Sequence, residues 1–158
     1  MKTVSVMFVC LGNICRSPAG EGIMRSLAKK HGLERRIGIE SCGMGDWHKG
    51  EAADQRMAEA ASARGYQLVS RAQAFQDTFI DTFDYLLAAD HSIQEQLLQK
   101  ARSESDRQRI FMMTAFSNRY TNEEVPDPYY GGKQGFELVM MILEDSCLGL
   151  IERIKKQL

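Results

Sequence analysis

The sequence predicts an α/β fold, a three-layer sandwich in which a four-stranded parallel sheet has helices on both faces. Four short apolar runs alternate along the chain with longer segments whose apolar residues recur every three or four positions. Strands that alternate with helices favour a parallel sheet, and right-handed crossovers leave few possible strand orders. The chain has 158 residues and no repeat or linker, so we expect one domain over residues 1–158.

The four apolar runs are the predicted strands. The first, VSVMFVC at residues 4–10, is short, continuous and β-branched, which is typical of a buried strand. The others are RIGIESCG at residues 36–43, FDYLLAA at residues 83–89 and RIFMMT at residues 109–114. In such sheets ligands bind beyond the carboxyl ends of the strands, where the strand order reverses. The loop that follows residue 10 is therefore a candidate site.

The first predicted helix follows that loop and covers about residues 18–31. Pro18 stands in its first turn and Gly32 lies beyond its end, as helix start and stop signals require. Gly20 and Gly22 weaken this helix by roughly 1 kcal/mol each relative to alanine. The prediction therefore rests on the signals at its two ends.

Three further helices are expected. One covers residues 54–64 and is closed by Gly65, and another covers residues 90–102, where Asp90 can cap the first turn. The last is the clearest, because its apolar residues recur at three- and four-residue steps and lysines stand at its end. Its apolar stripe comprises Phe136, Val139, Met140, Leu143, Cys147, Leu150, Ile151 and Ile154.

Composition narrows the function classes. The 20 Lys and Arg residues balance the 21 Asp and Glu residues, so no general basic character argues for a nucleic-acid partner. No apolar run is long enough to span a membrane, and the N-terminal run is too short for a signal peptide. We therefore expect a soluble, cytoplasmic protein with no membrane or nucleic-acid partner.

The four cysteines form no CxxC pair and have no histidine spacing typical of zinc, so no metal site is predicted. Cys42 ends an apolar run and Cys147 lies in the stripe of the last helix. Both are therefore expected to be buried, reduced thiols. The other two, Cys10 and Cys15, lie at the loop after the first strand.

That loop reads C-x5-R-S. Seven residues between a strand and a helix can form a cup of inward-pointing N–H groups, and Gly12 and Asn13 tolerate the positive φ that such a cup requires. The following helix adds its positive N-terminal end, and Arg16 can bind two phosphate oxygens at once. The cup therefore suits a phosphate dianion. Its residues after Cys10 are Leu11, Gly12, Asn13, Ile14, Cys15, Arg16 and Ser17.

Cys10 is the expected nucleophile of this cup. Helix N-termini and nearby cations favour a thiolate over a thiol, and Ser17 can donate a hydrogen bond to it. A thiolate beneath a bound phosphoryl group can attack phosphorus. A C-x5-R pattern also arises by chance, and a cysteine at a strand end is often a core residue. The strand, the Gly-Asn turn and the proline-started helix together favour the functional interpretation.

Transfer of a phosphoryl group to a thiolate also needs a proton for the leaving oxygen. Asp127 in VPDPYYGG lies between two prolines that stiffen the loop after the fourth strand. A carboxyl group in an aromatic pocket can serve as a general acid. The alternative is an ordinary surface turn, since Asp-Pro and Gly-Gly are typical of turns. The C-x5-R-S motif favours the acid.

These segments together resemble a low-molecular-weight protein tyrosine phosphatase. VCLGNICRSP near the N-terminus, FDYLLAAD in mid-chain and PDPYYGG before the last helix occur in the order and spacing of that family, over nearly the whole chain. The resemblance implies a four-stranded parallel sheet with flanking helices, a phosphoric monoester hydrolase, and no cofactor or metal. The implied substrate is a phosphotyrosine-containing protein or a small aryl phosphate.

The resemblance also implies roles for single residues. Cys10 is the nucleophile, Arg16 binds phosphate and stabilises the transition state, and Asp127 acts as general acid and then as base. Ser17 assists Cys10 as a leaving group, and Asn13 holds the shape of the loop. The aromatic positions that wall the substrate pocket are matched by Trp47, Tyr129 and Tyr130.

Two positions depart from the pattern of the family. Ser70 stands where a histidine often supports the asparagine of the loop, so we expect Asn13 to be held in another way, for example by water. Ile93 stands where an asparagine is common. Neither change removes a chemical role.

Three other functions have less support. Arsenate reduction on the same fold uses two further cysteines near the third strand, and residues 67–99 contain none. Phosphoarginine phosphatases tend to have threonine at the position of Ile14, which here favours tyrosine phosphate. A phosphate-binding module without activity would lack the nucleophile or the acid, and both are present.

Cys15 has no role in phosphoryl transfer. An activated thiolate is easily oxidised to sulfenic acid, and a curled loop can bring Cys15 within disulfide distance of Cys10. We therefore expect Cys15 to have a redox role, the capture of oxidised Cys10 as a disulfide. The alternative is a small residue that fills the space behind the loop.

Overall fold

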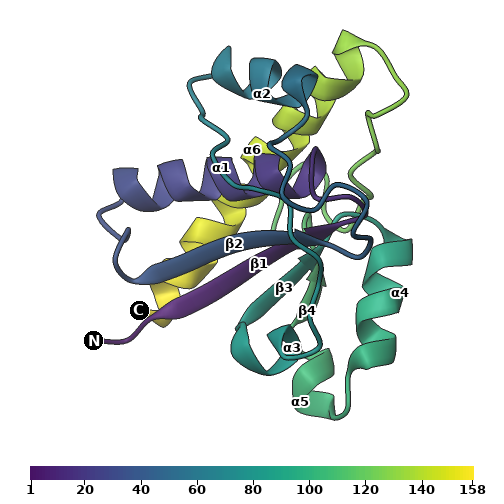
Figure 1. Ribbon diagram of the computed structural model, residues 1–158. Helices are drawn as coiled ribbons and strands as arrows, with labels where there is room; N and C mark the ends of the chain where they lie inside the picture. Colours follow the sequence, from purple (N-terminus) through teal and green to yellow (C-terminus); the bar gives the residue numbers. More distant parts are fainter.

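A parallel sheet of four strands forms the middle layer of the molecule. Its strands are β1 (Val4–Cys10), β2 (Ile37–Gly43), β3 (Tyr85–Ala88) and β4 (Ile110–Met112). The computed structural model describes residues 1–158, and the strand order is β2-β1-β3-β4 with every neighbouring pair parallel. The predicted four-stranded parallel sheet is therefore confirmed (Figure 1).

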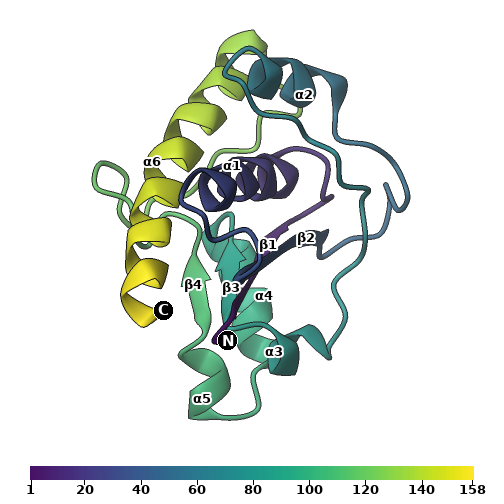
Figure 2. The same ribbon diagram turned by 90° about the vertical axis from the view of Figure 1, so that its left-hand side faces the viewer.

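Helices cover both faces of this sheet. They are α1 (Arg16–Lys30), α2 (Gln55–Ser62), α3 (Phe79–Thr82), α4 (His91–Lys100), α5 (Glu104–Arg107) and α6 (Lys133–Gln157). One face is covered by α1, α2 and α6, and the other by α3, α4 and α5, which completes the predicted three layers (Figures 1 and 2). None of the helices has both the length and the apolar character that crossing a membrane requires.

β1 is buried on both faces, as its continuous apolar run predicts. Val6, Phe8 and Cys10 belong to the core beneath α1 and α6, while Met7 and Val9 belong to the core beneath α4. Side chains alternate along a strand, so Cys10 at the end of β1 leaves the sheet on the side of α1. The register of the sheet thus directs the thiol toward the N-terminal end of that helix.

Some element boundaries differ from the prediction. α1 begins at Arg16, before the predicted start at Pro18, so Arg16 and Ser17 belong to its first turn. The strand predicted over residues 83–89 and the helix predicted over residues 54–64 are both shorter in the structure. α3 and α5 are not predicted from the sequence, because four residues are too few to show a helical period.

Close packing explains the two glycines within α1. A Cβ atom at Gly20 would collide with the ring of Phe8 in β1, and a Cβ atom at Gly22 would collide with Leu68. Glycine is unfavourable in the interior of a helix. At these two positions, however, it lets α1 lie against the sheet and against the segment after α2. The helix therefore forms in spite of its low intrinsic propensity.

All four cysteines are unpaired and buried. This confirms the expectation that Cys42 and Cys147 are buried, reduced thiols. Burial also raises the pKa of the Cys147 thiol, so this side chain behaves as an apolar core residue.

Candidate active site

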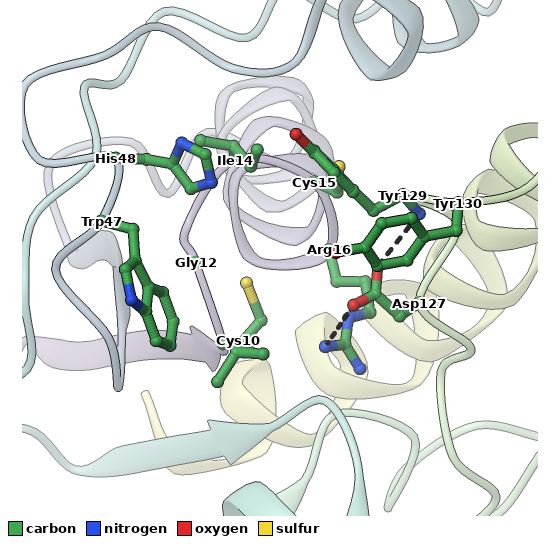
Figure 3. A pocket seen from close by; sticks show the side chains of 11 residues that line it. Cys10, Gly12, Ile14, Cys15, Arg16, Trp47, His48, Asp127, Tyr129 and Tyr130 are labelled. Carbon is green, nitrogen blue, oxygen red and sulfur yellow. Dashed lines mark hydrogen bonds and ion pairs between the residues drawn. The ribbon is translucent and has the colours of Figure 1, made fainter.

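A pocket of about 360 Å³ lies at the carboxyl end of β1 (Figure 3). β1 has β2 on one side and β3 on the other, so this is the point at which the strand order reverses. All of its lining residues except His48 are predicted from the sequence. The predicted ones are Cys10, Leu11, Gly12, Ile14, Cys15, Arg16, Trp47, Asp127, Tyr129 and Tyr130.

Residues 10–16, the phosphate loop, connect β1 to α1. Backbone N–H groups of the segment after β2 donate to the carbonyl oxygens of Cys10 and Leu11, at 2.9 Å each. The N–H groups of residues 11–15 donate to no acceptor within the protein. Asn13 has a φ of 58°, the positive value that the sequence predicts for this turn. Unpaired N–H groups in such a curl form a nest for an anion.

Cys10 lies in this loop with 2% of its surface exposed. Its Sγ atom is 2.9 Å from the Oγ atom of Ser17, which belongs to the first turn of α1. Nδ2 of Asn13 donates to the same hydroxyl oxygen at 2.7 Å. Because that oxygen accepts from Asn13, the one hydroxyl proton of Ser17 has two acceptors within reach, the sulfur of Cys10 and the carbonyl oxygen of Cys42 at 3.3 Å.

Arg16 is 3% exposed and has two fixed acceptors. Nη1 donates to Oδ2 of Asp90 at 2.8 Å and to the carbonyl oxygen of Val125 at 3.1 Å. Nη2 lies 3.7 Å from Oδ2 of Asp127 (Figure 3). Asp90 also accepts from the N–H of Ile93 at 2.8 Å, which confirms the predicted cap of α4. The ion pair between Asp90 and Arg16 joins residues 74 positions apart, so no local sequence pattern indicates it.

Asp127 belongs to the loop that enters α6 and faces the pocket (Figure 3). Its side chain is 45% exposed, and its Oδ1 atom accepts from the N–H of Tyr129 at 3.0 Å. Pro126 before it is exposed and Pro128 after it is buried, so the loop is anchored on one side of the aspartate. A carboxyl group that reaches both the pocket and the solvent can exchange its proton with water between two chemical steps.

Aromatic rings wall the entrance of the pocket. Trp47 is 67% and Tyr130 is 94% exposed, and the rings of Tyr129 and Tyr130 meet edge to face with centroids 5.0 Å apart. The ring of His48 lies 6.3 Å from that of Tyr129, and its Nδ1 atom is 3.2 Å from Oε2 of Glu51. His48 is not predicted from the sequence, and its only signal is its place next to Trp47 in a polar loop.

Protein groups hold Asn13, which confirms the expectation that it is held in another way than by a histidine side chain. The N–H of Gln73 donates to Oδ1 of Asn13 at 2.9 Å. Nδ2 donates to Ser41 at 2.9 Å as well as to Ser17. The backbone of the segment after Ser70 therefore takes over the support that a histidine side chain would give.

Cys15 lines the pocket beside Arg16 and is 5% exposed. Burial raises the pKa of the Cys15 thiol to about 12, and the negative charge of Asp54 adds to the effect. Only a thiolate is a strong nucleophile, so the Cys15 thiol is a weak nucleophile at neutral pH.

The polar groups of the pocket suit an anion. No three His, Cys, Asp or Glu side chains gather where they could hold a metal ion. The donors that converge are the N–H groups of the loop and the guanidinium of Arg16, which together match the oxygens of a phosphoryl group.

Known proteins of one family match this chain over nearly its whole length. The sequence profile described as low molecular weight phosphotyrosine protein phosphatase matches residues 5–158. The low molecular weight protein-tyrosine-phosphatase of Streptomyces coelicolor is 34% identical over 157 residues, covering 98% of this chain and 96% of that protein. YfkJ, the low molecular weight protein-tyrosine-phosphatase of Bacillus subtilis, is 37% identical over 159 residues, covering 98% and 97%. A crystal structure of a protein tyrosine phosphatase from Entamoeba histolytica matches with a TM-score of 0.93 and 39% identity, covering 98% of this chain and 99% of that chain.

Proposed function

The chain belongs to the low molecular weight phosphotyrosine protein phosphatase family and is a phosphatase, and from this premise we propose that it hydrolyses phosphotyrosine through a phosphocysteine intermediate on Cys10. The observation that carries the proposal is the convergence of Cys10, Arg16 and Asp127 on one pocket, with the hydroxyl of Ser17 at 2.9 Å from the sulfur. The substrate is a phosphotyrosine-containing protein or a small aryl phosphate.

In the first step the sulfur of Cys10 attacks phosphorus and the bond from phosphorus to the phenolic oxygen breaks. The loop N–H groups and Arg16 hold the phosphoryl oxygens and stabilise the charge that develops on them. Asp127 gives its proton to the leaving phenolate. This step leaves Cys10 phosphorylated and Asp127 ionised.

In the second step water attacks the phosphocysteine. Asp127, now a carboxylate, takes a proton from the water, and the bond between sulfur and phosphorus breaks. The sulfur leaves as a thiolate, and the hydroxyl of Ser17 stabilises it by donating a hydrogen bond. Phosphate is released and the starting protonation states return.

The walls of the pocket support an aryl substrate. Trp47, Tyr129 and Tyr130 form an apolar rim that a phenyl ring can contact while its phosphate reaches the loop. Ile14 also lines the pocket and places an apolar side chain there. This lining supports tyrosine phosphate over phosphoarginine, and no cysteine in residues 67–99 supports arsenate reduction.

Substitution of the nucleophile tests the function. Cys10→Ser should abolish turnover of 4-nitrophenyl phosphate and retain binding of phosphate or vanadate, because the loop N–H groups and Arg16 remain. Arg16→Lys should lose most of kcat, since lysine cannot form the forked contact. Steady-state kinetics and isothermal titration with phosphate measure both effects. Near-wild-type turnover of Cys10→Ser would refute the assignment.

We also propose a redox role for Cys15. Peroxide oxidises the Cys10 thiolate to a sulfenic acid, and the Cys15 sulfur then attacks Cys10, forming a disulfide and releasing water. Both thiols line the same pocket and are unpaired, which supports this step. Because burial keeps Cys15 protonated, its attack is expected to be slow.

Recovery after oxidation tests that role. Wild type treated with peroxide and then dithiothreitol should regain almost all activity, whereas Cys15→Ala should regain only part, because its sulfenic acid oxidises further. Equal recovery of the two proteins, or no Cys10–Cys15 link in the oxidised protein by mass spectrometry, would leave Cys15 as a packing residue.

Two wider expectations belong with this function. Residues 1–158 are proposed to be one phosphatase domain, which the match of the family profile to residues 5–158 supports. A cytoplasmic location is proposed from the four unpaired cysteines.

A further inference from the structure

A buried carboxylate lies behind the phosphate loop, and the mechanism above gives it no task. Glu21 in α1 is 4% exposed. A buried charge is costly unless it is paired and hydrogen-bonded. Glu21 has two such partners, because Oε1 accepts from the hydroxyl of Ser41 at 2.6 Å and Oε2 accepts from Nε of Arg25 at 2.8 Å. The two oxygens therefore serve two different donors.

Hydrogen bonds connect Glu21 to the nucleophile. Ser41 accepts from Nδ2 of Asn13 at 2.9 Å, and the same Nδ2 donates to Ser17 at 2.7 Å. The Oγ atom of Ser17 in turn lies 2.9 Å from the sulfur of Cys10 and 3.3 Å from the carbonyl oxygen of Cys42, so its one proton has two acceptors within reach. A serine hydroxyl has one proton. Because Ser41 gives its proton to Glu21, its lone pairs remain available to Asn13.

We propose that Glu21 is a positioning residue that sets the direction of these hydrogen bonds, so that the proton of Ser17 is directed at the sulfur of Cys10. This role rests on the proposed function, in which the sulfur attacks phosphorus and leaves it as a thiolate. Asn13 is then held at both ends of its amide, by the N–H of Gln73 at Oδ1 and by Ser41 at Nδ2.

Only a side chain with two acceptor atoms can satisfy both Arg25 and Ser41. Glutamine has the same shape as glutamate but has one acceptor and one donor end. In a Glu21→Gln variant the Nε of Arg25 can only donate, so the amide oxygen turns to Arg25 and the amide nitrogen turns to Ser41. Ser41 then faces two donors, Nδ2 of Asn13 and the amide nitrogen of the glutamine. It is only 2% exposed, so water does not supply an acceptor for its proton. Its own proton has lost its acceptor, so Ser41 shifts away from Asn13.

The test uses Glu21→Gln, Arg25→Ala and the double variant. Glu21→Gln should lower kcat for 4-nitrophenyl phosphate about 10-fold, the effect of one misdirected hydrogen bond to a charged group. The phosphocysteine trapped during turnover should also make up a larger fraction of the enzyme than in wild type, because loss of the sulfur from phosphorus is slowed. Arg25→Ala should stay within about 2-fold of wild type, since Glu21 still accepts from Ser41.

The double variant distinguishes an effect of Glu21 on hydrogen-bond direction from an effect of Glu21 on packing. Without Arg25 the glutamine is free to turn its oxygen to Ser41, so Glu21→Gln/Arg25→Ala should recover to within about 3-fold of wild type. A role in packing or net charge predicts that the double variant is at least as slow as Glu21→Gln. That result, or wild-type kcat in Glu21→Gln, would overturn the proposal. If Glu21→Gln does not fold, Ser41→Ala replaces it, with the same expected loss of kcat and the same larger fraction of phosphocysteine.

A Ser17→Ala background separates failure of this role from failure of the proposed function. Ser17→Ala alone should be slow, and adding Glu21→Gln should change kcat by less than about 2-fold, because the affected proton is already gone. Multiplicative losses would show that Glu21 acts by another route and leave the function intact. An unchanged rate in both Ser17→Ala and Cys10→Ser would instead refute the phosphocysteine mechanism itself.

Discussion

Arg16, for which we propose a catalytic role, is held by residues far away in the sequence. Its guanidinium is almost fully buried, which is costly without acceptors. Asp90 and the carbonyl oxygen of Val125 fix Nη1, so the planar group cannot rotate about its axis. The nitrogen nearest Asp127 is thereby held before the substrate arrives. Preorganised donors of this kind need little rearrangement in the transition state.

Asp127 provides a prediction at the same scale. Asp127→Asn should slow hydrolysis of phenyl phosphate by about 10²–10⁴-fold, because phenolate needs a proton to leave. The loss on 4-nitrophenyl phosphate should be much smaller, since nitrophenolate is a good leaving group. Comparison of kcat/KM for the two esters measures the effect.

The pattern across the two esters matters more than the size of either loss. Equal losses on both would assign Asp127 a structural role, for example in the turn that it makes with Tyr129. Asp90→Asn is a useful comparison, because it alters the partner of Arg16 and should slow both esters alike.

At the scale of elements, the end of β2 determines the shape of the phosphate loop. Gly43 pairs with Cys10 across the sheet. A Cβ atom at Gly43 would lie 2.7 Å from the carbonyl oxygen of Leu11 and 2.9 Å from the backbone nitrogen of Asn13. Both are backbone atoms of the loop and cannot move aside as a flexible side chain can. The loop therefore takes its curl partly because β2 ends in glycine.

Gly43→Ala should displace the loop and separate the sulfur from the N–H groups. We expect kcat to fall about 10²-fold, as is typical when catalytic groups are misplaced by about 1 Å. The free energy of unfolding should fall by only about 1–3 kcal/mol, the usual cost of overpacking. Steady-state kinetics and urea unfolding measure the two effects.

Gly38→Ala is the matched control, because it lies in the same strand and its Cβ atom would meet only Ser5, at 4.0 Å. It should leave kcat unchanged. Similar kinetics of Gly38→Ala and Gly43→Ala would mean that the close approach at Gly43 does not shape the loop.

At the scale of the whole molecule, the sheet and the phosphate loop are the parts that local patterns predict. The continuous apolar run of β1 and the stripe of α6 each identify their element without reference to the rest of the chain. Likewise the C-x5-R-S motif occupies consecutive residues between a strand and a helix, so its proposed chemistry can be inferred from the local sequence. The position of the pocket then follows from parallel topology.

Other parts of the site depend on contacts between distant segments, which a local pattern does not encode. The pair of Arg16 with Asp90 and the bond from Gln73 to Asn13 join elements far apart in sequence. Glu21 stands on an ordinary helix position, and only the fold shows that it faces Ser41. His48 has no distinctive spacing, so its place in the pocket also needed the structure.

The phosphocysteine that we propose on Cys10 is the central claim, and trapping it is the most direct test. Wild-type enzyme is acid-quenched during turnover of 4-nitrophenyl phosphate, digested and analysed by mass spectrometry. We predict one phosphoryl group on the peptide that contains Cys10, in a larger fraction of molecules for Asp127→Asn and in none for Cys10→Ser. Turnover with an unmodified Cys10 peptide throughout, or with the phosphoryl group on another residue such as His48, would contradict the role of Cys10.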